Sequence, residues 1–282
     1  MTAVAETAVG PERTAAPLGR LLAAEVRWVF RRPRTLITLG LFALIPVLVA
    51  VGVVVADRNG PGLIGAVAGN GLVLPIAALT LALALLLPLA TAMAAADALA
   101  GEAAHGTLRG LLLAPVSRVR LVGVKAFGVL VVAAAAVLVI AVVGVLAGMV
   151  VVGSADGQMV TLSGTTLGFG EGVARVGLVA VWVLGQLAAV GAVALAVSSL
   201  TEHPLVVLAS VLGGLIAFGV LSAIPALDWL QPWLLTSGWT AATDALRDPV
   251  ALDAMGSSTV RALCYAAIGL GITVWRMQRR DA

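Results

Sequence analysis

Charged, cysteine, lysine and aromatic residues are all scarce in this chain. Of its 282 residues, 11% are charged and 4% aromatic, whereas 61% are hydrophobic, and the mean hydropathy is +1.11. Soluble globular domains carry about a quarter charged residues, so this chain cannot cover its apolar surface with its own polar side chains. We therefore expect lipid to be its solvent and exclude a soluble globular protein.

The shortage of cysteine and histidine limits the possible metal chemistry. Cys264 is the only cysteine, so no disulfide can form within the chain, and there is no CxxC motif. Glu102 and His105 have the spacing of di-iron bundle sites, but such sites need a second copy and further carboxylates. The other histidine, His203, lies far along the chain beside Glu202. We expect neither a metal site nor a catalytic residue.

A phosphate-binding loop of the form GxxxxGK[ST] is also missing. The chain is therefore not expected to bind a nucleotide by itself. The net charge is +3 and the pI is near 10, but the basic residues cluster at the ends of apolar runs, which indicates membrane orientation rather than nucleic-acid binding. Lys125 is the only lysine beside many arginines, which is typical of a GC-rich bacterial genome.

Long charge-free stretches are what the chain does have. About 20 apolar residues cross the hydrocarbon core as a helix. We predict an all-α polytopic membrane protein with transmembrane helices at 36–56, 72–94, 126–152, 173–200, 205–226 and 257–275. Pro75 and Pro88 predict kinks in the second span. Residues 1–17 are read as a cytoplasmic tail without a cleaved signal peptide, and 18–282 as one transmembrane domain.

Arginine and lysine divide unequally between the two sides of the membrane. One side holds Arg13, Arg20, Arg27, Arg31, Arg32, Arg34, Arg109, Arg118, Arg120, Lys125, Arg276, Arg279 and Arg280; the other holds Arg58, Arg175, Arg247 and Arg261. The positive-inside rule makes the first side cytoplasmic. We expect both termini inside, in the inner membrane of a bacterial cell.

Residues 18–34, just before the first span, have helical periodicity. Arg20, Arg27 and Arg31 share one face, and the opposite face is apolar except for Glu25. This pattern predicts an amphipathic helix on the cytoplasmic leaflet, with its arginines toward anionic headgroups. An ordinary basic flank with helical character is the alternative.

The cytoplasmic segment 97–118, between the second and third spans, contains an apolar cluster outside the lipid. Gly106 and Pro115 bracket a short apolar helix that carries Leu108, Leu111 and Leu112. Exposed apolar surface of this kind is typical of a protein contact. A helical hairpin lying against the membrane is the alternative.

This segment resembles the permease subunits of ABC-2 type transporters. The matching positions are Glu102, Gly106, Thr107, Leu108, Leu111, Leu112, Pro115, Val116, Ser117, Arg118 and Lys125. The resemblance implies that the segment is a coupling helix that docks on a separate ABC ATPase subunit, which would hold ATP and magnesium. It also implies a dimer with a second permease chain and outward movement of a lipid, drug, peptide or glycoconjugate.

Arg175 and Arg261 lie near the outer ends of the fourth and sixth spans. We expect them to snorkel to the headgroups, or else to attract an anionic substrate or pair with Glu171 or Asp253. The hydrocarbon centre has no ionisable residue, which argues against the alternative of an ATPase-independent secondary transporter or channel. A membrane-embedded enzyme is discounted because Ser198 and Ser199 have no base beside them.

Overall fold

The computed structural model describes residues 17–55, 67–68, 70–107, 117–153 and 158–279. These residues are almost entirely helical, apart from a hairpin of two short antiparallel strands. The α-helices are α1 (Leu18–Arg31), α2 (Pro33–Val55), α4 (Leu74–Ala84), α5 (Leu86–Ala98), α6 (Ala100–Ala104), α8 (Arg118–Ala147), α9 (Phe169–Leu200), α10 (Pro204–Ser222) and α11 (Leu252–Arg279). The remaining elements are the 3-10 segments η1 (Gly71–Val73), η4 (Pro225–Trp233) and η5 (Leu235–Leu246), the π-helical η2 (Gly148–Val152), and strands β1 (Met159–Val160) and β2 (Thr166–Leu167).

The described residues contain 6 helices that are long and apolar enough to cross a membrane. They are α2, α5 with α6, α8 with η2, α9, α10 and α11. The prediction of an all-α polytopic membrane protein is confirmed. Lipid offers no hydrogen-bond partners, so the chain must satisfy its backbone within helices at this depth.

The predicted second span, 72–94, is not one kinked helix but is divided between the two helices α4 and α5. The chain breaks at Leu85, which has non-helical φ/ψ angles of −151° and −49°. Pro88 explains this break, because its ring clashes with the carbonyl of the residue four positions earlier and it lacks an amide hydrogen. Pro75 does not kink the span as predicted but lies in the first turn of α4, where a missing amide hydrogen costs nothing.

The third span begins earlier than its apolar run. We expected it to start at Ala126, with Lys125 just outside, but α8 starts at Arg118 with Ser117 as its N-cap, whose Oγ accepts a hydrogen bond from the Arg120 amide at 3.3 Å. Lys125 therefore lies two turns inside the helix and is only 5% exposed. The observed bounds of α9, α10 and α11 likewise differ from the predicted ones by a few residues, because helix ends depend on caps and packing as well as on hydropathy.

Helix α9 forms the centre of the bundle. It packs against α5, α8 and α11, and 61% of the residues in its most apolar 18-residue stretch are buried. Gly148 lies directly against the backbone of Gly71, and Gly144 against Pro75, so a side chain at either position would clash. The Gly144/Gly148 pair thus serves close packing within the chain.

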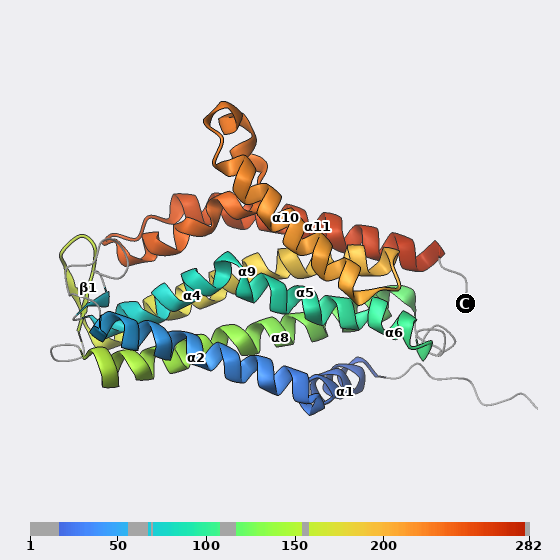
Figure 1. Cartoon of the computed structure of the whole chain (residues 1–282), viewed down its shortest axis with the longest axis horizontal. Coiled ribbons are helices and arrows are strands. Elements are labelled where there is room, and N and C mark those ends of the chain that lie inside the picture. The colour runs from blue at the N-terminus through green and yellow to red at the C-terminus, as the bar shows by residue number, and fades with distance from the viewer. Residues whose placement is uncertain (1–16, 56–66, 69, 108–116, 154–157, 280–282) are drawn as a thin grey trace, which may run out of the picture.

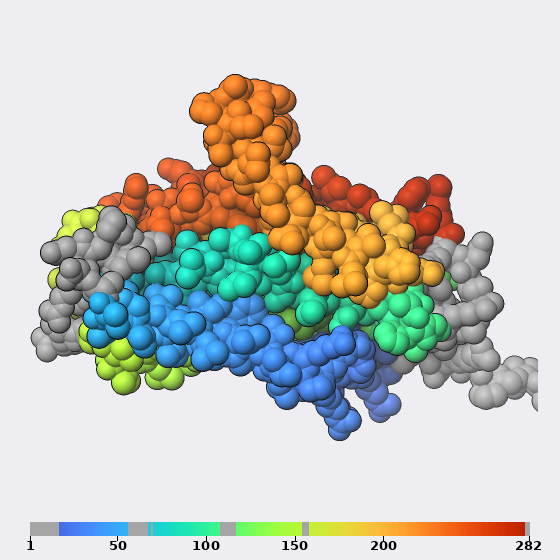
Figure 2. All heavy atoms as spheres, viewed as in Figure 1, coloured from blue at the N-terminus to red at the C-terminus, as the bar shows by residue number. Residues whose placement is uncertain are grey.

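Helix α10 is attached to the bundle much more loosely. Only 11% of the residues in its most apolar 18-residue stretch are buried. Figure 1 shows α10 running obliquely away from the other helices, and η4 forms a knob that stands off the bundle in Figure 2. Trp229 and Trp233 on this knob are 69% and 70% exposed. From the knob, η5 returns along α11 and packs against it.

The two ends of the bundle differ in charge. Helices α1 and α6 and the C-terminal end of α11 gather at one end, and the β1–β2 hairpin lies at the other (Figure 1). We call the first the basic end, because it carries the arginines of α1 and the last turn of α11. Among the described residues, the arginines of α1 and of the last turn of α11 are thus grouped as the sequence predicted.

Candidate functional site: a buried ion cluster at the basic end

A buried lysine connects three helices at the basic end. The Lys125 ammonium of α8 lies 2.7 Å from Glu102 Oε1 of α6 and 3.4 Å from Glu25 Oε1 of α1. The lysine side chain is 6% exposed and both carboxylates are 12% exposed. A buried charge needs a partner, and here two carboxylates from different helices provide it. We refer to Glu25, Glu102 and Lys125 as the ion triad.

Glu25 is the one charged residue on the otherwise apolar face of α1. The apolar face of α1 packs on α8, so a carboxylate on that face points into the protein and not toward lipid. Its Cγ and Oε1 lie close to Gly128, one turn beyond Lys125, where any side chain would collide with the carboxylate. Glu25 therefore does not disturb the packing of α1, because its carboxylate pairs with Lys125 of α8.

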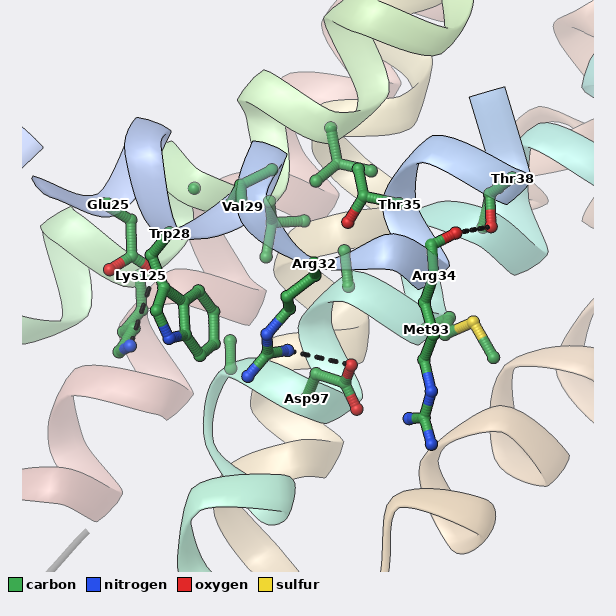
Figure 3. Close-up of a pocket in the computed structure, with 16 residues that line it drawn as sticks. Glu25, Trp28, Val29, Arg32, Arg34, Thr35, Thr38, Met93, Asp97 and Lys125 are labelled. Atoms are coloured by element: carbon green, nitrogen blue, oxygen red, sulfur yellow. Dashed lines mark hydrogen bonds and ion pairs between the residues drawn. The ribbon is translucent and has the colours of Figure 1, made fainter. Parts of the chain in front are cut away.

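Trp28 and Arg32 extend the triad along α1 toward the second span. The Arg32 guanidinium lies 3.3 Å from the centre of the Trp28 ring, and the Lys125 ammonium lies 4.9 Å from it. Arg32 Nη1 also donates to Asp97 Oδ2 at 3.0 Å. Figure 3 shows Trp28 between the two cations, with Arg32 reaching toward Asp97 on α5. The indole face attracts cations, so the ring links the two ion pairs.

Two cavities border this cluster. A small one of about 60 Å³ runs between α1, α5 and α8 beside Trp28 and Asp97. A larger, open one of about 550 Å³ is lined by Arg32, Glu102, His105 and Thr107 among others. The larger cavity thus lies beside the start of the predicted coupling segment.

The first residues of that segment are held by local hydrogen bonds. Helix α6 ends at Ala104, and Gly106 adopts a φ of +71°, a left-handed conformation that glycine tolerates and that commonly ends helices. Thr107 Oγ1 donates to the Glu102 carbonyl at 3.1 Å, and His105 Nδ1 lies 2.6 Å from the Gly101 carbonyl. The His105 ring thus forms a hydrogen bond within its own segment, with the carbonyl of Gly101 in α6.

The rest of the coupling prediction is only partly visible. Leu108, Leu111, Leu112, Pro115 and Val116 lie outside the described residues. On the far side of the segment, Arg118 Nη1 donates to the Met277 carbonyl of α11 at 3.4 Å. The structure brings Glu102 and Lys125 together and ties Arg118 to α11, so both ends of the segment are anchored on spans.

Ser198, which we had discounted as a nucleophile, has a structural contact here. Its Oγ accepts a hydrogen bond from the Ala100 amide at 2.9 Å. This contact joins α9 to the α5–α6 break at Leu99, where the backbone leaves helical geometry. Ser199 Oγ donates to the Ala196 carbonyl within α9. The two hydroxyls are thus used in holding helices.

At the opposite end, Arg175 does not simply snorkel. It lies six residues into α9 and donates to the carbonyls of Ala245 at 3.1 Å and Arg247 at 2.7 Å. Its Nη2 also lies 3.3 Å from Asp248 Oδ1. The expected carboxylate partner was Glu171, which instead accepts from the Gly168 amide as a helix cap. The guanidinium fork of Arg175 clamps the end of η5.

Arg261 is deeper in the bundle than the sequence suggested. It lies nine residues into α11, which at 1.5 Å per residue is about 13 Å along the helix. Its Nη1 donates to the Leu234 carbonyl at 2.6 Å and to Ser237 Oγ. Neither Asp253 nor another carboxylate lies within 4 Å of it among the described residues. Arg261 thus holds the other end of η5.

Sequence reasoning missed several residues of these sites. Glu25 could have been noticed, because it interrupts the apolar face of α1. Asp97 could also have been noticed, because it is the first charge after the long apolar run of the second span. Nothing in the sequence pointed from Trp28, Arg32 or Asp248 to their partners, which come from distant parts of the chain.

Comparison with known proteins agrees with this architecture. Residues 21–188, more than half of the chain, match the sequence profile of a family described as ABC-2 family transporter protein. The match begins in α1, ends within α9 and includes the whole ion triad. No curated protein matches the chain. The bundle of membrane-spanning helices and the profile match together show that this chain belongs to the ABC-2 transporter family, as a transmembrane permease of an ABC-type system.

Proposed function

We propose that the chain is the membrane-spanning half of an exporter and that it moves an amphipathic cargo outward with energy from a separate ABC ATPase subunit. The ATPase, which holds ATP and magnesium, docks at the basic end. That end faces the bacterial cytoplasm, and both chain termini lie on the cytoplasmic side of the cell membrane. Lipids, drugs, peptides and glycoconjugates are the cargo classes that the family resemblance implies.

The observation that carries this proposal is the ion triad. Glu102 and Lys125 lie on either side of segment 102–118 in the chain, yet their charged groups are 2.7 Å apart. A displacement of the segment therefore acts on α6 and α8 together, and through Glu25 on α1. Packed elements joined by buried charges move as a unit rather than deforming gradually. The proposed coupling residues are Glu102, Gly106, Thr107, Leu108, Leu111, Leu112, Pro115, Arg118 and Lys125.

At the far end, Arg175 and Arg261 suggest an outer gate. Each holds one end of η5 through backbone carbonyls. Release of these contacts would free η5 from α9 and α11 and open a path to the outside. The two arginines thus act on the gate, and Arg261, which has no carboxylate within 4 Å among the described residues, is also a possible contact for an anionic cargo.

A second permease chain is the proposed partner within the membrane. Helix α10 and the knob at η4 expose a broad apolar surface that includes Ile216, Val220, Trp229 and Trp233. Interfaces are enriched in tryptophan at their centres. The same surface would otherwise face lipid.

The experiment that tests the proposal compares variants of the coupling segment after co-expression with an ABC ATPase subunit from the same genome. Leu111→Asp combined with Leu112→Asp places charge at the proposed contact, so ATPase co-purification should fall at least tenfold while membrane insertion is retained. Glu102→Gln should keep assembly and reduce export per ATP hydrolysed. Asp253→Asn, a carboxylate at the opposite end, is the matched control and should change neither.

Normal ATPase binding and normal export in the double aspartate variant would refute the coupling role of the segment. Transport by the purified chain without any ATPase would favour a secondary transporter or channel instead.

A further inference from the structure

Gln186 is a buried amide without a partner in the middle of a membrane-spanning helix. The residue is 0% exposed, and neither its Nε2 nor its Oε1 has a hydrogen-bond partner among the described residues. It lies at the centre of α9, where water is absent and an unpaired polar group costs several kcal/mol. Such a residue marks a place where a group from outside the chain completes the hydrogen bonding.

The contacts around Gln186 show which element covers it. Trp182 lies one turn before it on the same face of α9, and its Nε1 donates to Ser258 Oγ at 3.2 Å. Gly238 of η5 packs against the same Ser258. One turn after Gln186, Val190 lines a cavity together with Leu235 of η5. Segment η5 therefore packs near the face of α9 that carries Trp182 and Gln186.

The part of η5 at this depth carries two further polar atoms that are buried and unpaired within the described chain, Thr236 Oγ1 and Trp239 Nε1. The two residues are three apart in a 3-10 segment, so they share a face. Arg261 grips this part of η5 through Leu234 and Ser237. The amide hydrogens of Gln186, the indole N–H, the threonine hydroxyl and the guanidinium form a set rich in donors with a net positive charge.

An apolar cavity adjoins these donors. Its volume is about 110 Å³, and it lies between α9, α10 and α11, lined by Val190, Val211, Leu215, Phe218 and Tyr265 among others. Tyr265 is one turn after Arg261 on α11. A hydrocarbon chain therefore fits in the cavity, and an anionic group fits beside the donors.

We propose that Gln186, Thr236, Trp239 and Arg261 bind the anionic headgroup of an amphiphile whose alkyl chain occupies the cavity between α9, α10 and α11. This inference rests on the proposed function for the view that the ligand is cargo. A neutral headgroup would satisfy the amide but would leave Arg261 without a counter-charge in a medium where isolated charges are costly. When the outer gate opens, the bound anion takes the place of the Leu234 carbonyl and Ser237 Oγ as the partner of Arg261.

The test measures thermal stabilisation of the purified full chain in a non-ionic detergent by three amphiphiles of twelve carbon atoms each. The probes are laurate, dodecanol and dodecylamine, which are anionic, neutral and cationic. A ligand that binds the folded protein raises its midpoint of thermal unfolding, and we expect laurate alone to do so. In Gln186→Leu the laurate concentration for half-maximal stabilisation should rise about tenfold, the factor that one lost hydrogen bond to a charged group represents.

Gly185→Leu is the matched control, since Gly185 is at the same depth but exposed on the outer surface of α9, where an added side chain would meet open space. It should leave the laurate response unchanged. The ligand-free Gln186→Leu protein should be at least as stable as the parent, because leucine removes an unpaired buried amide. A clear loss of stability would show that the amide is paired within the fold and would overturn the proposal.

Equal stabilisation by laurate and dodecanol would overturn the assignment of an anionic ligand. An unchanged laurate response in Gln186→Leu would overturn the site itself. Because the measurement needs no ATPase, its failure is distinct from failure of the proposed function, which appears as loss of ATPase assembly or of coupling.

Discussion

Replacing Lys125 by methionine is the most direct test of the ion triad. Methionine keeps most of the length and apolar volume of the lysine side chain but removes the ammonium. Glu25 and Glu102 would then be two carboxylates, each 12% exposed, facing a site with no cation between them. The remaining nearby cation, Arg32, is already paired with Asp97 at 3.0 Å.

The expected cost follows from the burial of these groups. Removing one partner of a buried ion pair typically destabilises a protein by about 3–5 kcal/mol, because the other charge is left buried and unpaired. For a chain of this size, 1 kcal/mol shifts the unfolding midpoint by about 2–4 °C, so Lys125→Met should lower the midpoint by roughly 10 °C. Glu25→Gln should cost much less, because it leaves the shorter contact between Lys125 and Glu102 intact.

The assay is the temperature at which half of the monodisperse gel-filtration peak is lost after heating in detergent. The combination of Lys125→Met with Glu25→Gln and Glu102→Gln removes all three charges and should recover most of the loss. Exchanging the charges, with Glu102→Lys and Lys125→Glu together, should also be more stable than Lys125→Met. If Lys125→Met alone unfolds within about 2 °C of the parent, a shift below about 1 kcal/mol, the triad is not a buried structural link and the reasoning is refuted.

Three further predictions concern the outer end, the topology and the source of energy. Arg175→Lys should destabilise the protein by about 2 kcal/mol and accelerate proteolysis of η5, because lysine cannot make the forked contact with two carbonyls and Asp248; unchanged proteolysis would show that the clamp is unimportant. In a Cys264→Ser background, Leu162→Cys should react with an impermeant thiol reagent from outside intact cells and His203→Cys should not; the reverse pattern would invert the proposed orientation. The purified chain alone should not hydrolyse ATP, and hydrolysis that co-purifies with it through every step and requires no second subunit would contradict the assignment.

The helices were predictable from the sequence to different degrees. The first and fifth spans were placed within a few residues, because charge or proline bounds their apolar runs on both sides. The second and third were less well placed: Pro88 divided one into two helices, and Lys125 proved to lie inside the other. The break in the second span follows from the local effect of Pro88. In the third span packing overrode a local rule, since a lysine can enter a helix interior once two carboxylates from elsewhere accompany it.

The site was less predictable than the fold. Glu102 and Lys125 were both named on family resemblance, but nothing in the sequence paired them with each other or with Glu25. Arg261 was placed near the headgroups, because the start of its helix was set too late; the earlier start at Leu252 puts it deep in the bundle. Gln186 drew no attention, because an uncharged residue barely alters the hydropathy of a long apolar run.

The sequence by itself determined that this chain is an all-α membrane protein, and it predicted where most of the long apolar helices of the described residues lie. These properties are local: lipid requires each crossing to be an apolar helical stretch whose backbone bonds are internal, so each can be read from its own roughly 20 residues. The tertiary structure alone decided which charges meet. Lys125 pairs with residues 23 and 100 positions away, and η5 folds back against α9 and α11. Such contacts depend on which helix faces pack together, and hydropathy does not specify that.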